Sequence, residues 1–203
     1  VIVVFILLSA TLGALAPRRE RPVSDRPVVA ATIFPLYDLV RRVGGGVVDA
    51  VLILPPGAEP HDFEPRASPI RDVQTASAIY AIGHGLDGWV TEITPSGIPI
   101  VTVDRGIVLR RAEDDEYGAI DPHYWLSVPN AAAIAETVAD DLFARFPDSR
   151  TRIETNLAVL IAELDALDAE IRATLSPVVS KNIITFHEAW YYFTNEYGLT
   201  VVG

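Results

Sequence analysis

The sequence predicts an α/β protein with two lobes, each a mainly parallel sheet flanked by helices, joined by one long helix. Short apolar runs rich in Val and Ile alternate with helix-like segments from residue 28 onward, a pattern typical of parallel sheets covered by helices. The segment 149–176 has the periodicity of one long helix. Strand-like and helix-like segments resume after it, and the sequence stops within a strand. We therefore expect the C-terminal lobe to be truncated in this chain.

The N-terminal lobe is expected to span residues 28–148. Its first helix, PLYDLVRRVGG, starts with Pro and ends with Gly, the residues that favour those two positions. Further helices are expected at 67–77 and 129–146. Because ligands of parallel sheets bind at the carboxyl ends of strands, the loops after the strands are the places to search for a site. The expected strands are VVAATIF at 28–34, VVDAVLIL at 47–54, AIYAIG at 78–83 and IPIVTV at 98–103.

The segment 149–176 is expected to connect the two lobes. A helix of roughly 25 residues is about 38 Å long at 1.5 Å per residue, which is longer than a connection within one sheet needs. Residues 177–203 then begin the C-terminal lobe, with a strand at 182–186 and a helix closed by Gly198. The apolar residues at steps of three and four, which predict one buried helix face, are Leu157, Leu160, Ile161, Leu164, Leu167, Ile171 and Leu175.

Residues 1–27 are expected to be a signal or anchor segment followed by a Pro- and Arg-rich linker. The run VIVVFILLSATLGALAP is too short for a comfortable membrane span and suits the apolar core of a secretory signal. It predicts export to the periplasm or cell surface. The alternatives are a buried N-terminal strand and an uncleaved membrane anchor.

The composition narrows the function classes. The formal net charge is −11, which argues against non-specific nucleic-acid binding and mildly favours cations. Cys and Met are both absent, so the chain has no disulfide, no thiolate metal site and no thioether ligand.

Three of the four histidines follow Pro residues or a strand end. His61 lies in EPHDFEP, His123 in DPHYWLS and His187 in TFHEAW. Neutral imidazoles that converge from loops suit a transition metal, and three of them leave one tetrahedral position open. Their spacing alone is weak evidence, because a histidine in a loop is more often a solvated side chain.

Three longer motifs around these histidines resemble a known family. They are GAEPHDFEP at 57–65, DPHYWL at 121–126 and FHEAWYYF at 186–193. In this order they are similar to signatures of the metal-binding solute-binding proteins of bacterial ABC importers for zinc and manganese. These are periplasmic binding protein-like molecules, and the match to the zinc-uptake type covers residues 28–203.

The resemblance implies metal ligands at His61 and His123 in the N-terminal lobe and at His187 in the C-terminal lobe. An acidic fourth ligand would come from beyond residue 203, and the long helix would be a rigid spine. The ion would be a transported ligand delivered to a membrane permease by a monomeric protein that is not an enzyme. Three nitrogen ligands favour zinc, with manganese as the alternative, since Mn²⁺ prefers oxygen.

Some features depart from this family or leave alternatives open. Zinc-specific members often carry a His-rich loop, whereas 113–117 reads EDDEY and is interpreted as an ordinary solvated loop. His84 is interpreted as a turn residue bound to water, with a place near the cleft as the alternative. A zinc-dependent hydrolase with Glu188 as base and a surface adhesin are the competing functions.

Overall fold

The computed structural model describes residues 25–65, 73–112 and 120–202. A four-stranded, all-parallel sheet has the order β2-β1-β3-β4, so the predicted parallel sheet is confirmed. The segment 1–24, the loop 113–117 and residues 67–72 of the expected helix 67–77 lie outside the described residues. The strands are β1 Val28–Ala31, β2 Asp49–Leu52, β3 Ala76–Ala81 and β4 Ile100–Thr102.

Several predicted boundaries are wrong. The strand expected at 28–34 ends at Ala31, and Phe34 already begins a helix. The strand expected at 182–186 covers only Asn182–Ile183. Ala76 and Ser77 were expected at the end of a helix, but they begin β3. The strand is almost entirely buried and pairs with β1 on one side and β4 on the other. Ladder hydrogen bonds on both sides therefore override the weak helical preference of the short local sequence.

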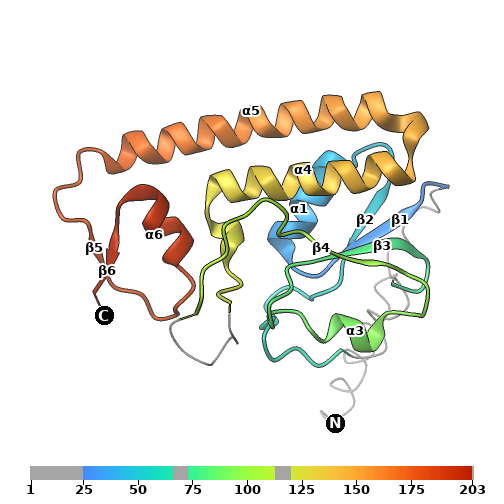
Figure 1. Cartoon of the computed structure of the whole chain (residues 1–203), viewed down its shortest axis with the longest axis horizontal. Helices are drawn as coiled ribbons and strands as arrows, with labels where there is room; N and C mark the ends of the chain where they lie inside the picture. The colour runs from blue at the N-terminus through green and yellow to red at the C-terminus, as the bar shows by residue number, and fades with distance from the viewer. Residues whose placement is uncertain (1–24, 66–72, 113–119, 203) are drawn as a thin grey trace, which may run out of the picture.

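The helices of this part of the chain follow their sequence signals. Helix α1, Phe34–Val43, has Pro35 in its first turn and Gly44 at its C-cap. Helix α4, Val128–Arg145, begins after Ser127, whose hydroxyl accepts a hydrogen bond from the Asn130 amide as a capping residue does. A short helix α3, Val90–Ile93, lies on the other side of the sheet from α1 and α4 (Figure 1).

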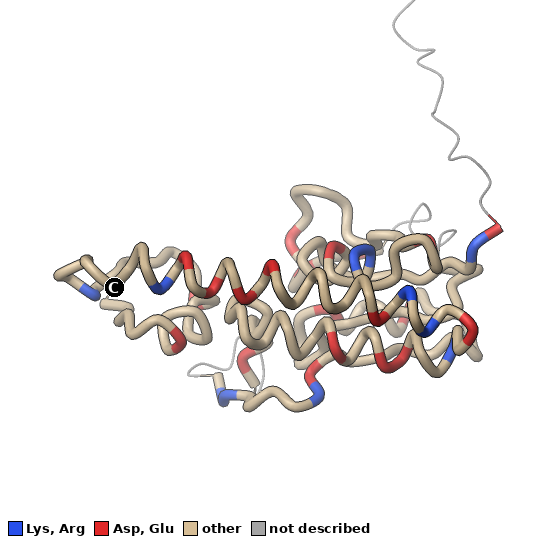
Figure 2. Tube along the Cα trace, turned by 90° about the horizontal axis from the view of Figure 1, so that it is seen from above, with Lys and Arg blue, Asp and Glu red and all other residues tan. Residues whose placement is uncertain are grey.

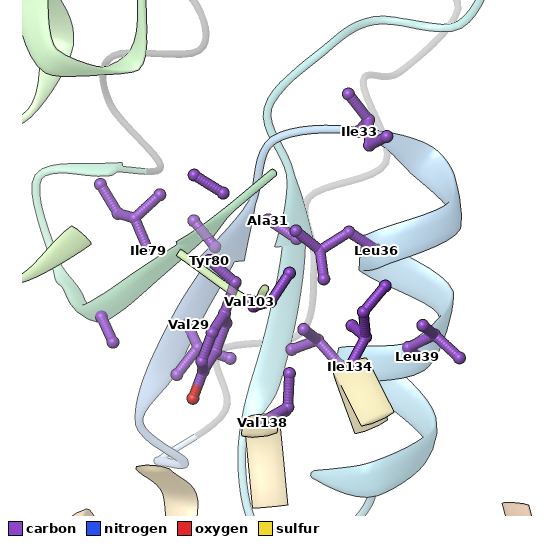
Figure 3. Close-up of a cluster of buried hydrophobic side chains, with 14 of the residues drawn as sticks. Val29, Ala31, Ile33, Leu36, Leu39, Ile79, Tyr80, Val103, Ile134 and Val138 are labelled. Atoms are coloured by element: carbon purple, nitrogen blue, oxygen red, sulfur yellow. The ribbon is translucent and has the colours of Figure 1, made fainter. Parts of the chain in front are cut away.

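The core lies between the sheet and the helices α1 and α4 (Figure 3). Val29, Leu36, Ile79 and Ile134 are at most 1% exposed. Burial of this kind contributes on the order of 1.5–3 kcal/mol per large aliphatic side chain. The close packing gives the loops at the carboxyl ends of the strands a rigid base.

Helix α5, Arg150–Leu175, covers α1 and α4 and continues beyond them (Figure 1). Its far end lies over a small group of elements: β5 Asn182–Ile183, α6 Tyr191–Tyr197 and β6 Thr200–Val201, with β5 and β6 parallel. We call β1 to α4 the N-terminal unit and β5 to β6 the C-terminal unit. At 1.5 Å per residue, 26 residues give α5 a length of about 39 Å.

The predicted apolar stripe of α5 is buried only in part. Leu160 is 1% exposed, whereas Leu167 is 44% exposed. The difference follows from position, because the first half of the helix packs on α1 and α4 and the second half extends past them (Figure 1). Beyond that point Arg172 binds Asp168 and Glu196, and the Tyr197 hydroxyl donates to Asp168.

Charges of both signs are interspersed along the helices (Figure 2). Arg150 pairs with Glu154 and Arg172 with Asp168, each one turn apart on α5. Exposed pairs of this kind contribute only about 0.3–0.5 kcal/mol each. None of the described helices combines the length and apolar character that crossing a bilayer requires.

Candidate metal centre

The loop that carries His61 is shaped by its Pro and Gly residues. The Ala58 amide donates to the Pro55 carbonyl at 3.1 Å, which closes a turn with Pro56 and Gly57 at its centre. Gly57 has a φ of 82°, the conformation that this position of a type II turn requires, and Pro favours the position before it. The prolines thus fix a tight turn three residues before His61.

Trp89, the residue just before helix α3, holds the same loop in place. Its indole Nε1 donates to the Pro60 carbonyl at 2.9 Å. Its ring meets Phe63 edge-on, with the ring centroids 4.8 Å apart. Since Pro60 and Phe63 flank His61 in the chain, Trp89 restrains the loop on both sides of this histidine.

His123 is held by a carboxylate two residues earlier. Asp121 Oδ1 accepts hydrogen bonds from the His123 backbone amide and from ring Nδ1, each at 2.9 Å. Both residues are buried, at 5% and 3% exposure. The bond to Nδ1 places the proton there and leaves the lone pair on Nε2, the orientation that a metal-binding histidine needs.

Asp121 is a functional residue that sequence reasoning missed, since it counted only as a member of a motif. The signal was present: an Asp side chain commonly accepts a hydrogen bond from the amide two residues later. The spacing Asp-Pro-His therefore predicts the backbone bond. The bond to the ring nitrogen depends on the tertiary arrangement.

His187 comes from the C-terminal unit, in the loop between β5 and α6. It is exposed, and its Nε2 lies 3.3 Å from His123 Nε2. A tetrahedral zinc ion with Zn–N distances near 2.0–2.1 Å holds its ligand nitrogens about 3.4 Å apart. The His123–His187 pair already has this separation.

The structure brings all three predicted histidines together. Each histidine offers one ring nitrogen as a possible metal ligand, and these nitrogens lie within 4.8 Å of one another. The ring centroids are 5.1–6.1 Å apart. Within the described ranges this is the one His, Asp or Glu cluster that could hold a metal ion. Two of these candidate ligands come from loops of the N-terminal unit and one comes from the C-terminal unit.

The surroundings favour neutral imidazole at His61. Burial lowers the pKa of His61 below its usual value, and a positive charge on His123 or His187 lowers it further. A neutral ring nitrogen is the form that binds a metal ion. Near neutral pH, His61 therefore needs no deprotonation before it binds a cation.

His84 lies in a turn, as expected, but it does not join the cluster. Its φ is 55°, and its Nε2 lies 2.8 Å from Asp104 Oδ2. Its partner is thus a carboxylate, in place of the expected water. Glu59, beside His61, contacts that residue's backbone amide at 3.5 Å.

A cavity of about 650 Å³ opens beside His187. Arg110, Asp121, Trp190 and Tyr191 contribute to its walls. The guanidinium of Arg110 lies 3.5 Å from the centre of the Tyr191 ring, a cation–π contact. The metal centre therefore lies at the edge of an open space between the two units.

Three imidazoles, two from loops of a parallel α/β unit and one from a second unit, converge in an arrangement that could hold a metal ion. The chain matches the sequence profile of ZnuA, the periplasmic component A of the zinc-uptake complex, over residues 29–203. It belongs to this family.

Relatives with curated names include binding proteins for two metals. The chain is 28% identical over 215 residues to the zinc-binding lipoprotein AdcA of Streptococcus pneumoniae, with 97% of this chain and 43% of AdcA covered. It is 28% identical over 205 residues to the manganese-binding lipoprotein MntA of Halalkalibacterium halodurans, covering 100% of this chain and 68% of MntA. The chain thus spans less than half the length of AdcA.

The fold is also that of solved family members. A crystal structure of a zinc-bound ZnuA deletion mutant superposes with a TM-score of 0.82 at 28% identity. The superposition covers 88% of this chain and 69% of that one. The predicted α/β fold class and the family are both confirmed.

Proposed function

We propose that this chain is the metal-capturing part of an extracytoplasmic zinc-binding protein that delivers the ion to an ABC importer. The observation that carries the proposal is the convergence of His61, His123 and His187. The Nε2 atoms of His123 and His187 lie 3.3 Å apart. Zinc uptake is the role in the family's description, and it requires binding and release, with no catalytic step.

Zinc is the proposed ion because the three side chains offer only nitrogen. Zinc accepts imidazole readily, whereas Mn²⁺ prefers oxygen ligands. AdcA is named for zinc. Manganese is the second candidate because MntA, similar at the same level of identity, is named for that metal.

The residues act by joining the two units around the ion. His61 and His123 are presented by anchored loops, and His187 adds a ligand from the C-terminal unit. An ion bound by all three stabilises one arrangement of the units, and the fourth position is left for an oxygen ligand or water. We propose lobes at 28–148 and 177–203, with 149–176 as their connecting helix.

The rest of the proposal follows from the family. A monomer carries the ion to a membrane permease, and residues 1–27 direct export or anchoring. Capture requires that His61, His123 and His187 bind zinc before the permease takes it over.

Calorimetric titration of the metal-stripped chain with zinc and with manganese tests this proposal. We expect one zinc per chain and loss of that binding in His61→Ala. His84→Ala is the matched control, because His84 lies outside the cluster and is bound to Asp104. Binding of manganese without zinc would replace the proposed metal, and stoichiometric binding of neither would overturn the site.

A further inference from the structure

We propose that Tyr192 is a positioning residue that couples His187 to His123 through its phenol hydroxyl. The inference rests on the proposed metal-binding function and adds a residue that contacts no metal. Tyr192 lies on α6, five residues after His187. Its side chain reaches from the C-terminal unit to the segment of the N-terminal unit that carries His123.

The hydroxyl of Tyr192 joins two segments of the N-terminal unit. It accepts a hydrogen bond from the Arg110 backbone amide at 2.9 Å and donates to the Asp121 carbonyl at 3.0 Å. These two segments are also bonded to each other, since the Asp121 amide donates to the Arg110 carbonyl at 3.0 Å. One hydroxyl thereby completes a small network between α6 and the His123 loop.

Asp121 connects this network to the metal centre. Its carbonyl accepts from Tyr192, and its carboxylate accepts from the amide and the ring of His123. A change in the position of α6 is therefore passed to the residue that orients His123. The same movement of α6 shifts His187, so the 3.3 Å separation of the two ring nitrogens depends on this contact.

The surroundings of Tyr192 make the contact persistent. The residue is 6% exposed, and its ring meets Tyr124, the neighbour of His123, with centroids 6.5 Å apart. Burial is the main cause of a raised pKa for the Tyr192 phenol, so the hydroxyl keeps its proton and remains a donor near neutral pH. Loss of a buried hydroxyl leaves its partners poorly satisfied.

Tyr197 provides a matched control on the same helix. It is 8% exposed, and its hydroxyl donates to Asp168 on α5 at 2.9 Å. Tyr197→Phe and Tyr192→Phe each remove one hydroxyl from a buried tyrosine that attaches α6 to a different element. Only Tyr192 bonds to the residue that holds His123.

The test compares zinc affinity, the absorption spectrum of bound Co²⁺ and thermal unfolding in wild type, Tyr192→Phe and Tyr197→Phe. We expect about tenfold weaker zinc binding in Tyr192→Phe, as for other residues that orient metal ligands, with altered Co²⁺ ligand-field bands. Tyr197→Phe should lose thermal stability but keep both metal properties. Equal affinity and spectra in all three proteins would overturn the inference, as would equal weakening in the two variants.

A second measurement needs no substitution. Hydrogen exchange of the Arg110 amide, which donates to Tyr192, should slow severalfold on zinc binding, while the core amide of Val103 stays unchanged. No slowing at Arg110 would overturn the coupling even if Tyr192→Phe fails to fold. Failure of the wild type to bind zinc is a separate outcome, since it overturns the proposed function and the coupling falls with it.

Discussion

The carboxylate of Asp121 bonds simultaneously to the backbone and the ring of His123, with Oδ1 2.9 Å from both nitrogens. The carboxylate therefore fixes the loop and the ring tautomer together. Such a partner raises the basicity of a ligand histidine and holds its ring in place. Zinc affinity should therefore depend on the hydrogen bonds that hold each histidine or its loop in place.

Replacement of Asp121 by Ala is expected to weaken zinc binding by about 10- to 100-fold, because the His123 ring loses its orienting acceptor. Asp121→Asn should be milder, since an amide oxygen still accepts from the His123 amide. Competition titration with a zinc chelator measures both. Asp104→Ala, which removes the partner of His84, is the control, and equal affinity in Asp121→Ala and Asp104→Ala would contradict this role.

Trp89→Phe tests the anchor of the His61 loop. The substitution keeps an aromatic ring near Phe63 but removes the N–H that donates to Pro60. A neutral hydrogen bond contributes about 0.5–1.5 kcal/mol, so zinc affinity should fall roughly two- to tenfold. Thr91→Val, which removes an exposed hydrogen bond in the short helix α3 that follows Trp89, should leave the affinity unchanged. An undiminished affinity in Trp89→Phe would show that the loop is held by other contacts.

The stability of the metal-free protein should depend on pH through His61. Its pKa is lowered in the folded state, mainly by burial, so the unfolded chain binds more protons between that lowered pKa and the ordinary value near 6.5. The free energy of unfolding therefore falls as the pH falls through this window. Urea unfolding in the presence of a chelator measures the slope, which should be flatter in His61→Gln. An identical slope in that variant would exclude His61 as the source.

Asp87 is expected to stabilise the fold without setting metal affinity. It is 1% exposed and accepts hydrogen bonds from the Thr32 hydroxyl and from the Ile82 and Gly83 amides, at 2.6–2.8 Å. Asp87→Ala leaves two buried donors and the partly buried Gly83 amide without this acceptor, at about 1–3 kcal/mol for each buried unsatisfied group. Urea unfolding should show a loss of at least 2 kcal/mol, with one zinc still bound per folded chain. A loss below 0.5 kcal/mol would mean that other groups satisfy these donors.

The sequence was informative where local rules decide the outcome. Pro35 and Gly44 mark the ends of α1, because Pro fits the first turn of a helix and Gly is favoured just past its end. The apolar periodicity of 149–176 predicted α5 almost to the residue. It did not show that Leu167 remains 44% exposed, because burial depends on what the helix faces.

The candidate site also has some features that the sequence predicted and others that only the structure shows. The three motifs predicted that His61, His123 and His187 are metal ligands, and the structure brings these side chains together. The sequence did not reveal that Trp89 holds the loop of His61 or that Tyr192 joins α6 to Asp121. These contacts link residues 29 and 71 positions apart in the chain, and no local pattern encodes such a pair.

The sequence by itself therefore determined the class of fold, the long helix and the three ligand candidates, because periodicity, turn residues and motif chemistry are local properties. The tertiary structure decided the distances between the ligands, the tautomer of His123 and the lowered pKa of His61. The distances to His187 depend on how the two units meet, whereas the tautomer of His123 and the pKa of His61 depend mainly on packing within the N-terminal unit. Tetrahedral zinc holds its ligand nitrogens about 3.4 Å apart, and only the packed chain brings His123 Nε2 and His187 Nε2 to 3.3 Å.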